Sequence, residues 1–173
     1  MKINRIEVGY LVCNCYVLEI DNKVLVIDPG DEYDKIKPYL KDKKVLGIIL
    51  THRHFDHIGS IDDIVRDYNV KVYDNNNLEE KEYKIDKFTF NIIKTPGHTM
   101  DSICIYFKKD KIMFTGDFIF KGSIGRCDLG GDIDLMNKSI DKIKKYNDDI
   151  IIYPGHGGSS SLGYEKEYNM YFR

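Results

Sequence analysis

The sequence contains no long hydrophobic run: none of its apolar segments approaches the roughly 20 residues that a helix needs to cross a bilayer. A secretory signal is missing as well, because charged residues such as Lys2, Arg5 and Glu7 interrupt the N-terminal segment and no small-residue cleavage site follows it. We therefore expect a cytoplasmic protein that does not act on a membrane.

A large excess of one charge is also missing. The 26 lysines and arginines and the 28 aspartates and glutamates are spread along the whole sequence, and the formal net charge is −2. This distribution indicates no basic face for nucleic acid or for an anionic membrane. Nucleic acid is therefore not an expected partner, whereas a small-molecule substrate is.

Cysteine is too scarce for a disulfide scaffold, since the whole chain contains only four. Cys13 and Cys15 have a spacing that could supply half of a thiolate metal site, but no second cysteine pair or nearby histidine in the sequence completes it. A strand through this segment would point both side chains inward. We expect buried free thiols at these positions.

A linker rich in serine and proline and an internal repeat are both absent, so residues 1–173 are expected to form one domain. The apolar pattern predicts a strand-rich start followed by alternating strands and helices, which is typical of a layered α/β fold. Strands are predicted at residues 3–8, 12–20, 23–27, 45–50, 70–73, 87–94, 103–107, 112–115 and 150–153, and helices at 32–41, 58–68, 132–147 and 164–170. Pro38 should end or bend the first helix. The third should bury one apolar face, formed by Ile133, Met136, Ile140 and Ile143.

Histidine is concentrated in one place: the segment THRHFDH at residues 51–57 holds three of the five histidines. Side chains two residues apart lie about 200° apart on a helix but point to the same side of an extended chain. Directly after the apolar run 45–50, His52 and His54 can therefore converge on one ion. Asp56 continues this alternation, while His57 departs from it as the chain turns into a helix. The segment thus offers two groups of ligands.

The remaining two histidines lie in similar turns. His98 in TPGH and His156 in YPGH each follow an apolar strand and a Pro-Gly turn, and Asp117 follows a strand and a glycine in FTGD. Loops at one edge of a rigid sheet usually carry the chemistry of α/β proteins. We therefore expect four strand ends to bring histidines and aspartates together at one edge.

A single histidine in such a pattern is more often a surface residue or a satisfied core residue than a ligand. All five histidines of this chain lie in such turns, however, and none is left for an ordinary surface role. Imidazole and carboxylate together suit Zn²⁺, iron or manganese. The set therefore predicts a metal site.

The segment THRHFDHIG resembles the THxHxDHxG signature of the metallo-β-lactamase superfamily, and the later histidines and aspartate match that family's ligand motifs in the correct order. The resemblance extends from NCYVLEIDNKVLVIDPGD to the last strand. It implies a four-layer αββα sandwich with two divalent metal ions at one edge of the central sheets, zinc being expected and iron or manganese being alternatives. It also implies a division of ligands: His52, His54 and His98 for the first ion, Asp56, His57 and His156 for the second, and Asp117 bridging both.

Such a site implies a hydrolase that needs no serine or cysteine nucleophile. A metal ion lowers the pKa of bound water to about 7 and polarises a carbonyl oxygen. The implied mechanism is attack of a metal-bridging hydroxide on a carbonyl, with Asp56 and Asp117 as the catalytic aspartates. Two divalent cations outweigh two aspartates in charge, so the substrate is expected to be electron-rich or anionic.

The segments GDFIFKGSIGRCDLGG and PGHGGSSSLGYEKEYNMYF look most like the glyoxalase II (hydroxyacylglutathione hydrolase) branch, whose members hydrolyse thioesters. In that branch a basic residue at the position of Arg126 contacts glutathione, which implies a substrate-binding role. A structural ion pair with Asp128, which stands where the branch has a tyrosine, is an equal alternative. Only residues 157–173 follow His156, so the C-terminal glutathione-binding helical domain of longer members is not expected.

Other functions stay open. Persulfide dioxygenases of the same superfamily carry a GRxD segment, present here as GRCD, but use one iron. A lactonase would present an ester-like carbonyl to the same hydroxide. A β-lactamase is less expected because such enzymes usually carry an export signal, and a purely structural zinc site is usually closed and rich in sulfur.

Overall fold

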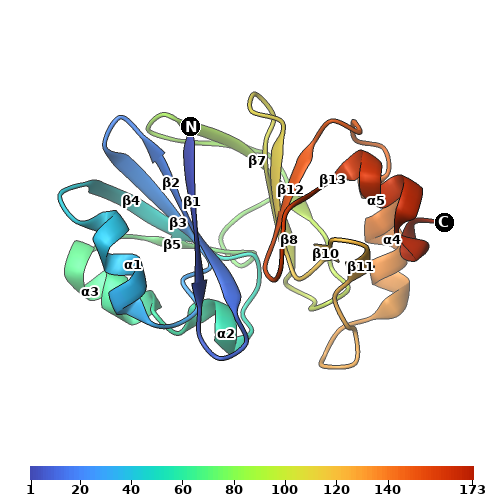
Figure 1. Ribbon diagram of the computed structural model, residues 1–173, viewed down its shortest axis with the longest axis horizontal. Helices are drawn as coiled ribbons and strands as arrows, with labels where there is room; N and C mark the ends of the chain where they lie inside the picture. Colours follow the sequence, from blue (N-terminus) through green and yellow to red (C-terminus); the bar gives the residue numbers. More distant parts are fainter.

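The computed structural model describes residues 1–173 and contains two β-sheets packed face to face, with helices on both outer faces. Figure 1 shows the four layers: α1 (Tyr33–Leu40) and α3 (Ile61–Tyr68) cover the sheet of the N-terminal half, and α4 (Ile133–Ile143) and α5 (Leu162–Tyr168) cover the sheet of the C-terminal half. The mixed α/β class and the αββα sandwich are therefore confirmed.

The first sheet is built from the N-terminal half in sequence order. Its strands are β1 (Lys2–Val8), β2 (Cys13–Ile20), β3 (Lys23–Ile27), β4 (Lys44–Ile49) and β5 (Val72–Tyr73). The first three strands pair antiparallel, whereas β4 pairs in parallel with both β3 and β5. Parallel strands end at the same edge of a sheet, so the segments that follow β3 and β4 start side by side.

The second sheet comes from the C-terminal half. Its order is β13 (Ser160–Ser161), β12 (Ile151–Pro154), β9 (Ile112–Gly116), β8 (Ile103–Phe107), β7 (Phe88–Lys94) and β6 (Glu82–Ile85). Strands β9 and β12 are parallel neighbours. The residues that follow these two strands, Asp117 and His156 among them, therefore leave the sheet at one edge.

Four short elements complete the chain. They are α2 (Phe55–Ile58), the hairpin of β10 (Ile119–Phe120) and β11 (Ser123–Ile124), and the 3₁₀ helix η1 (Met170–Phe172). In Figure 1, α2 lies at the lower edge of the first sheet, where the cleft between the two sheets opens. No helix is long and apolar enough to cross a membrane, since the longest, α4, has 11 residues.

The alternation of side chains in β2 shows how the layers are held. Cys15 and Val17 pack into the core between the first sheet and its helices, whereas Tyr16 and Leu18 pack into the core between the two sheets. A strand covered on both faces is mostly apolar, and residues 15–18 of β2 show this pattern in the sequence. Each fully buried side chain of this kind contributes about 1.5–3 kcal/mol.

Some predicted elements differ from the structure. The helix predicted at residues 58–68 is present as α3 but begins later, at Ile61, and a separate short helix, α2, runs from Phe55 to Ile58. Pro38 does not end α1, which continues to Leu40. Ile133 is 52% exposed and does not belong to the buried face of α4. The strands β6, β10, β11 and β13 were not predicted.

Candidate metal centre

All seven residues with the predicted ligand pattern lie together at the lower edge of the two sheets. The loop after β4 and the short helix α2 carry four of them, and the loops after β7, β9 and β12 carry one each. Three overlapping groups have ligand atoms within 4.8 Å of one another: His52, His54 and His98; His52, His57 and Asp117; and Asp56, His57 and His156, together with Cys13. The four strand ends therefore meet, as the sequence predicts.

Asp117 lies at the centre of the arrangement. One of its carboxylate oxygens is 3.2 Å from Nε2 of His57, and the other is 3.4 Å from Nε2 of His156 and 3.6 Å from Nε2 of His98. Nε2 of His98 is in turn 2.9 Å from Nδ1 of His54. One carboxylate thus faces histidines of both groups, as a bridging ligand would.

The other ring nitrogen of four histidines is held by an oxygen atom. Nδ1 of His57 lies 3.0 Å from a carboxylate oxygen of Asp28, and Nδ1 of His52 lies 3.1 Å from Oγ1 of Thr51. Nδ1 of His98 lies 2.6 Å from the carbonyl oxygen of residue 126, and Nδ1 of His156 lies 3.0 Å from that of residue 11. In the neutral rings these oxygens accept the Nδ1 proton, so Nε2 carries a free lone pair that points inward.

Asp28 and Thr51 were missed by the sequence reasoning, although they organise this edge. Thr51 donates from its backbone nitrogen and from Oγ1 to the two carboxylate oxygens of Asp28, over 2.8 and 2.6 Å. Because Oγ1 donates to Asp28, its lone pairs accept from His52. The available signal was the segment IDPGD, which places Asp28 at a strand end before a Pro-Gly turn, like the other site residues.

The buried polar atoms of the centre fit a bound cation. Nε2 of His52, Nε2 of His57 and one carboxylate oxygen of Asp117 are buried and have no hydrogen-bond partner in the protein. Buried polar atoms are nearly always satisfied, and an unpaired one carries a free-energy cost of about 1–3 kcal/mol. When the histidines are neutral, their nitrogen lone pairs converge with those of the carboxylate, which is the electronic arrangement that a divalent metal ion satisfies.

The carboxylates also shift the pKa values of the histidines beside them. Burial alone would lower the pKa of His57, but the charges of Asp28 and Asp117 outweigh burial and raise it well above its usual value. Burial is likewise outweighed at His156, where Asp117 and Asp56 raise the pKa to about 10. A cation that binds at these nitrogens must therefore displace protons from them.

Glycine is required where β9 and β12 approach each other. A Cβ at Gly155 would lie 2.2 Å from a carboxylate oxygen of Asp117 and 2.7 Å from Cε1 of His57. Gly116 has a φ of +50°, and a Cβ there would lie 2.2 Å from Oγ1 of Thr51. The glycines of FTGD and YPGH therefore allow the ligand side chains to occupy the space that a Cβ would take.

Cys13 is a buried free thiol, as predicted, but its surroundings were misjudged. A histidine does complete the group in space, because Sγ of Cys13 lies within 4.8 Å of the ligand atoms of Asp56, His57 and His156. Burial raises the pKa of this thiol to about 11, although His57 acts in the opposite direction. Sequence spacing could not reveal this neighbourhood, because β2 and α2 are brought together only by the tertiary fold.

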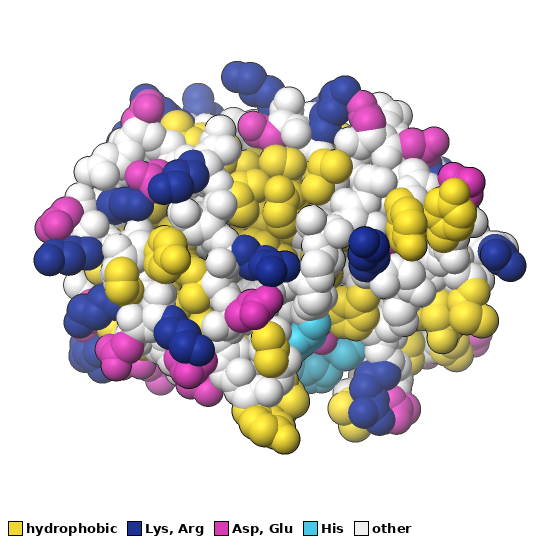
Figure 2. Space-filling view, in the orientation of Figure 1, with side chains coloured by type: hydrophobic (Ala, Val, Ile, Leu, Met, Phe, Trp, Pro, Cys, Tyr) yellow, Lys and Arg dark blue, Asp and Glu magenta, His cyan; other side chains and the backbone are white.

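A cleft of about 720 Å³ opens over the histidines and aspartates. Figure 2 shows the histidine side chains in a hollow at the lower edge, with hydrophobic side chains on both sides. Arg126 lines the cleft, as its predicted substrate-binding role requires, but its guanidinium is paired with Asp128 over 2.6 and 2.5 Å. Both side chains are exposed. The ion pair left open by the sequence is therefore present.

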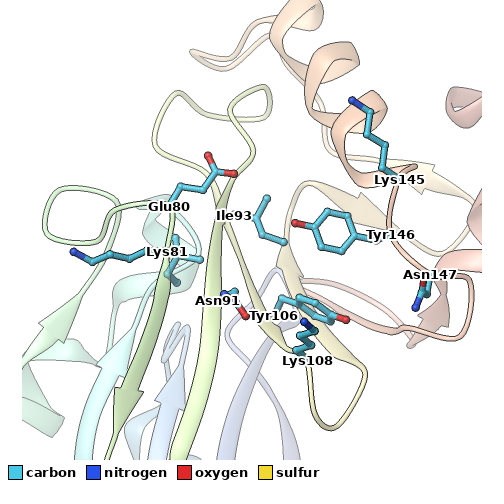
Figure 3. A pocket seen from close by; sticks show the side chains of 10 residues that line it. Glu80, Lys81, Asn91, Ile93, Tyr106, Lys108, Lys145, Tyr146 and Asn147 are labelled. Atoms are coloured by element: carbon cyan, nitrogen blue, oxygen red, sulfur yellow. The ribbon is translucent and has the colours of Figure 1, made fainter.

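A second cavity, of about 400 Å³, lies away from this edge between β7, β8 and the C-terminal end of α4. Figure 3 shows Tyr106 and Tyr146 side by side at this cavity, with Ile93 beside them and lysines at its margin, and the two rings meet edge to face with centroids 5.5 Å apart. It contains no histidine and none of the seven predicted ligands. The chemistry of the molecule is therefore concentrated in the first cleft.

A family model covers the residues of this centre. The model described as "Metallo-beta-lactamase superfamily" matches residues 8–77 and 72–156, which include all seven site residues. A probable metallo-hydrolase of Bacillus subtilis, YqgX, is 31% identical over 205 residues, covering 99% of this chain and 97% of that protein. The hydroxyacylglutathione hydrolase GloC of Haemophilus influenzae is 31% identical over 207 residues, covering 99% and 98%.

Solved structures agree with these relatives. The crystal structure of the BLEG-1 B3 metallo-beta-lactamase superposes with a TM-score of 0.95 at 31% identity and covers 99% of both chains. The structure of TTHA1623 in a di-iron-bound form superposes with a TM-score of 0.89 at 27% identity, covering 97% of this chain and 99% of that one. A protein with this fold can therefore hold two metal ions.

Proposed function

The chain belongs to the metallo-beta-lactamase superfamily, and we propose that it is a metal-dependent thioesterase of the glyoxalase II type. Its similarity to a probable metallo-hydrolase and to a hydroxyacylglutathione hydrolase supports this proposal. The observation that carries the proposal is the convergence of buried, unpartnered lone pairs from His52, His57 and Asp117. Two divalent ions fit this donor set, and zinc is the first choice because imidazole and carboxylate ligands suit it. Iron and manganese suit the same donors.

Each side chain has a proposed place at the metal pair. The first ion is assigned to His52, His54 and His98, and the second to Asp56, His57 and His156, with Asp117 shared between them. The bound metals would supply a hydroxide at neutral pH and polarise the carbonyl of the substrate. The protein's own residues then have three tasks, which are to hold the lone pairs in place, to orient the attacking water and to receive the substrate.

Asp56 and Asp117 are the proposed catalytic residues. Both line the cleft, and one carboxylate oxygen of Asp56 lies 3.2 Å from Nε2 of His156. We assign to Asp56 the hydrogen bond that orients the attacking water, because it has a carboxylate oxygen at the site and is only partly buried. Asp28 and Thr51 act through the histidines and are positioning residues.

A thioester is the proposed substrate because the hydroxyacylglutathione hydrolase GloC is similar to this chain over nearly its whole length. The test combines metal analysis with hydrolysis of a panel of thioesters, including lactoylglutathione, and of lactones, on zinc-loaded and iron-loaded protein. In Asp117→Asn and His54→Ala, we expect loss of bound metal and a fall in kcat of at least about 100-fold. Asp110→Asn, an exposed aspartate outside the site, is the matched control. Full activity in a variant that has lost its metal would disprove the metal-dependent mechanism.

A mononuclear-iron persulfide dioxygenase is the second candidate. His52 and His98 each lie close to Asp117, so two histidines and one carboxylate could form the ligand triad of a non-haem iron site. One iron per chain and oxygen uptake on glutathione persulfide would identify this activity. Two metals per chain and thioester cleavage without oxygen uptake support the hydrolase, and a lactonase would be recognised by cleavage of lactones in preference to thioesters.

A further inference from the structure

The cleft above the candidate metal centre has walls that are apolar. Five hydrophobic side chains line it, and we call them the apolar rim: Leu11, Phe55, Phe120, Ile124 and Leu129. They come from the β1–β2 turn, α2, the β10–β11 hairpin and the loop that follows it. Residues from four separate segments thus turn apolar surface toward the same opening.

Three members of the apolar rim are strongly exposed. The exposed fraction is 46% for Leu11, 74% for Phe55 and 57% for Leu129. Tyr10 and Val12, which flank Leu11 at the tip of the β1–β2 turn, are also exposed. Large exposed hydrophobic side chains gathered around a cleft usually mark a surface that an apolar ligand covers.

Free positive charge, by contrast, is missing from these walls. Arg126 is the only lysine or arginine that lines the cleft, and the edge of its guanidinium formed by Nε and one terminal nitrogen already binds the carboxylate of Asp128. A ligand carboxylate would have to displace Asp128 from this edge, or bind the remaining nitrogens of a guanidinium whose charge Asp128 already offsets. The positive charge expected at the metal pair acts on the carbonyl oxygen, not on the groups that reach the walls.

We propose that the groups on either side of the scissile carbonyl are apolar and uncharged, so that the substrate is an acyl thioester or ester with an aliphatic or aromatic body rather than a glutathione conjugate. This inference rests on the proposed hydrolase function and replaces the expectation of an anionic substrate. A glutathione thioester carries two carboxylates, for which the walls offer one cation, Arg126, already paired with Asp128, whereas an aliphatic chain gains contact with the apolar rim.

The first test compares compounds that differ in one terminal group. Hexanoyl and adipoyl thioesters of N-acetylcysteamine have acyl chains of six carbons, but the adipoyl chain ends in a carboxylate. With the metal-loaded protein, we expect kcat/KM for hexanoyl to exceed that for adipoyl and for lactoylglutathione by at least about tenfold. Each further methylene that becomes buried should add about fourfold to kcat/KM. Equal or faster cleavage of the anionic compounds would overturn the inference.

A binding measurement separates this inference from the hydrolase proposal. Hexanohydroxamate and adipic monohydroxamate bear a metal-binding head group and the same matched tails, and their affinity for the metal-loaded protein is measured by calorimetry. Tighter binding of hexanohydroxamate, by about tenfold, supports the apolar cleft even if no thioester is cleaved, and in that case only the hydrolase proposal fails. Equal affinities, or no gain over acetohydroxamate, would overturn the inference.

Two variants test the named side chains. Asp128→Asn should release Arg126 and raise the adipoyl-to-hexanoyl ratio of kcat/KM roughly two- to fivefold. Leu129→Ser should weaken binding of hexanohydroxamate and leave the bound metal in place, and the matched control is Met170→Ser, an exposed hydrophobic residue outside the cleft. An unchanged ratio in the first variant, together with unchanged binding in the second, would also count against the proposal.

Discussion

Asp28 links two parts of the candidate metal centre through one carboxylate, which accepts from Thr51 and lies against Nδ1 of His57. This residue is 1% exposed and has a positive φ of 48°, so it is held in a particular position by the turn that follows β3. Its only signal in the sequence is its place at a strand end in IDPGD. Its importance follows from contacts over 23 and 29 residues of sequence, which only the folded chain makes.

Asp28→Asn should therefore weaken metal binding without removing a ligand. One oxygen of Asp28 accepts from the backbone nitrogen of Thr51, and the other lies against Oγ1 of Thr51 and Nδ1 of His57. An amide can accept at one end only, so its NH2 group must face one of these two sets of donors, and the free lone pair on Nε2 of His57 is no longer assured. We expect a fall in metal affinity of about 10- to 100-fold, measured by competition with a chromogenic chelator. Asp62→Asn, an exposed aspartate on α3, is the control. Equal affinities for the two variants would exclude the positioning role.

Arg53 makes a contact with Asp74 that the sequence alone does not reveal. It stands between His52 and His54, and both Nε and one terminal nitrogen of its guanidinium donate to the same oxygen of Asp74. Asp74 is buried, and its other oxygen accepts from the backbone nitrogen of Asn76. The pair therefore ties the histidine loop to the turn after β5.

Arg53→Ala should leave the Asp74 carboxylate partly unpaired. Since the Arg53 side chain is 46% exposed, water can replace part of the lost interaction, and we expect the free energy of unfolding to fall by about 1 kcal/mol. Urea denaturation measures this change. Arg66→Ala, which removes an arginine from an exposed ion-pair group, should cost less than half as much. A larger effect at Arg66 than at Arg53 would contradict this assignment.

At the scale of elements, long buried strands were predictable and short pieces were not. β2, β3 and β4 coincide with the predicted strands because both of their faces are covered, which leaves a continuous apolar run. The helix after the histidines was predicted to its correct end as α3, but α2 was missed because its four residues are too few for an apolar period. The two-residue strands β10, β11 and β13 exist only through their pairing partners.

Close packing at the ends of β9 and β12 predicts that a larger residue at position 155 is not tolerated. Gly155→Ala would place a Cβ against the carboxylate of Asp117, which must move together with the end of β12. We expect a loss of about 1–3 kcal/mol in the free energy of unfolding and weaker metal binding. Gly158→Ala is a matched control, because a Cβ there meets nothing within 4 Å. Denaturant titration and metal analysis of both variants decide the matter, and indistinguishable behaviour would refute the steric argument.

For the whole molecule, the candidate metal centre lies across the junction of the two halves. Four of its seven predicted ligands follow β4 of the first sheet, and the other three follow β7, β9 and β12 of the second. The sequence predicted this convergence because every ligand stands at a strand end. It could not predict which face of the cleft is apolar, since the members of the apolar rim are scattered over residues 11–129.

Metal removal should therefore destabilise the fold as a whole. An ion that binds only the folded protein stabilises it by about 4 kcal/mol at a concentration 1,000 times its Kd. For a domain of this size, that corresponds to a Tm higher by roughly 10 °C, which calorimetry with and without a chelator measures. His54→Ala, which lacks one predicted ligand, should begin with a lower Tm and respond less to the chelator. If the chelator strips the metal and the Tm of the native sequence stays the same, the ions do not hold the two halves together.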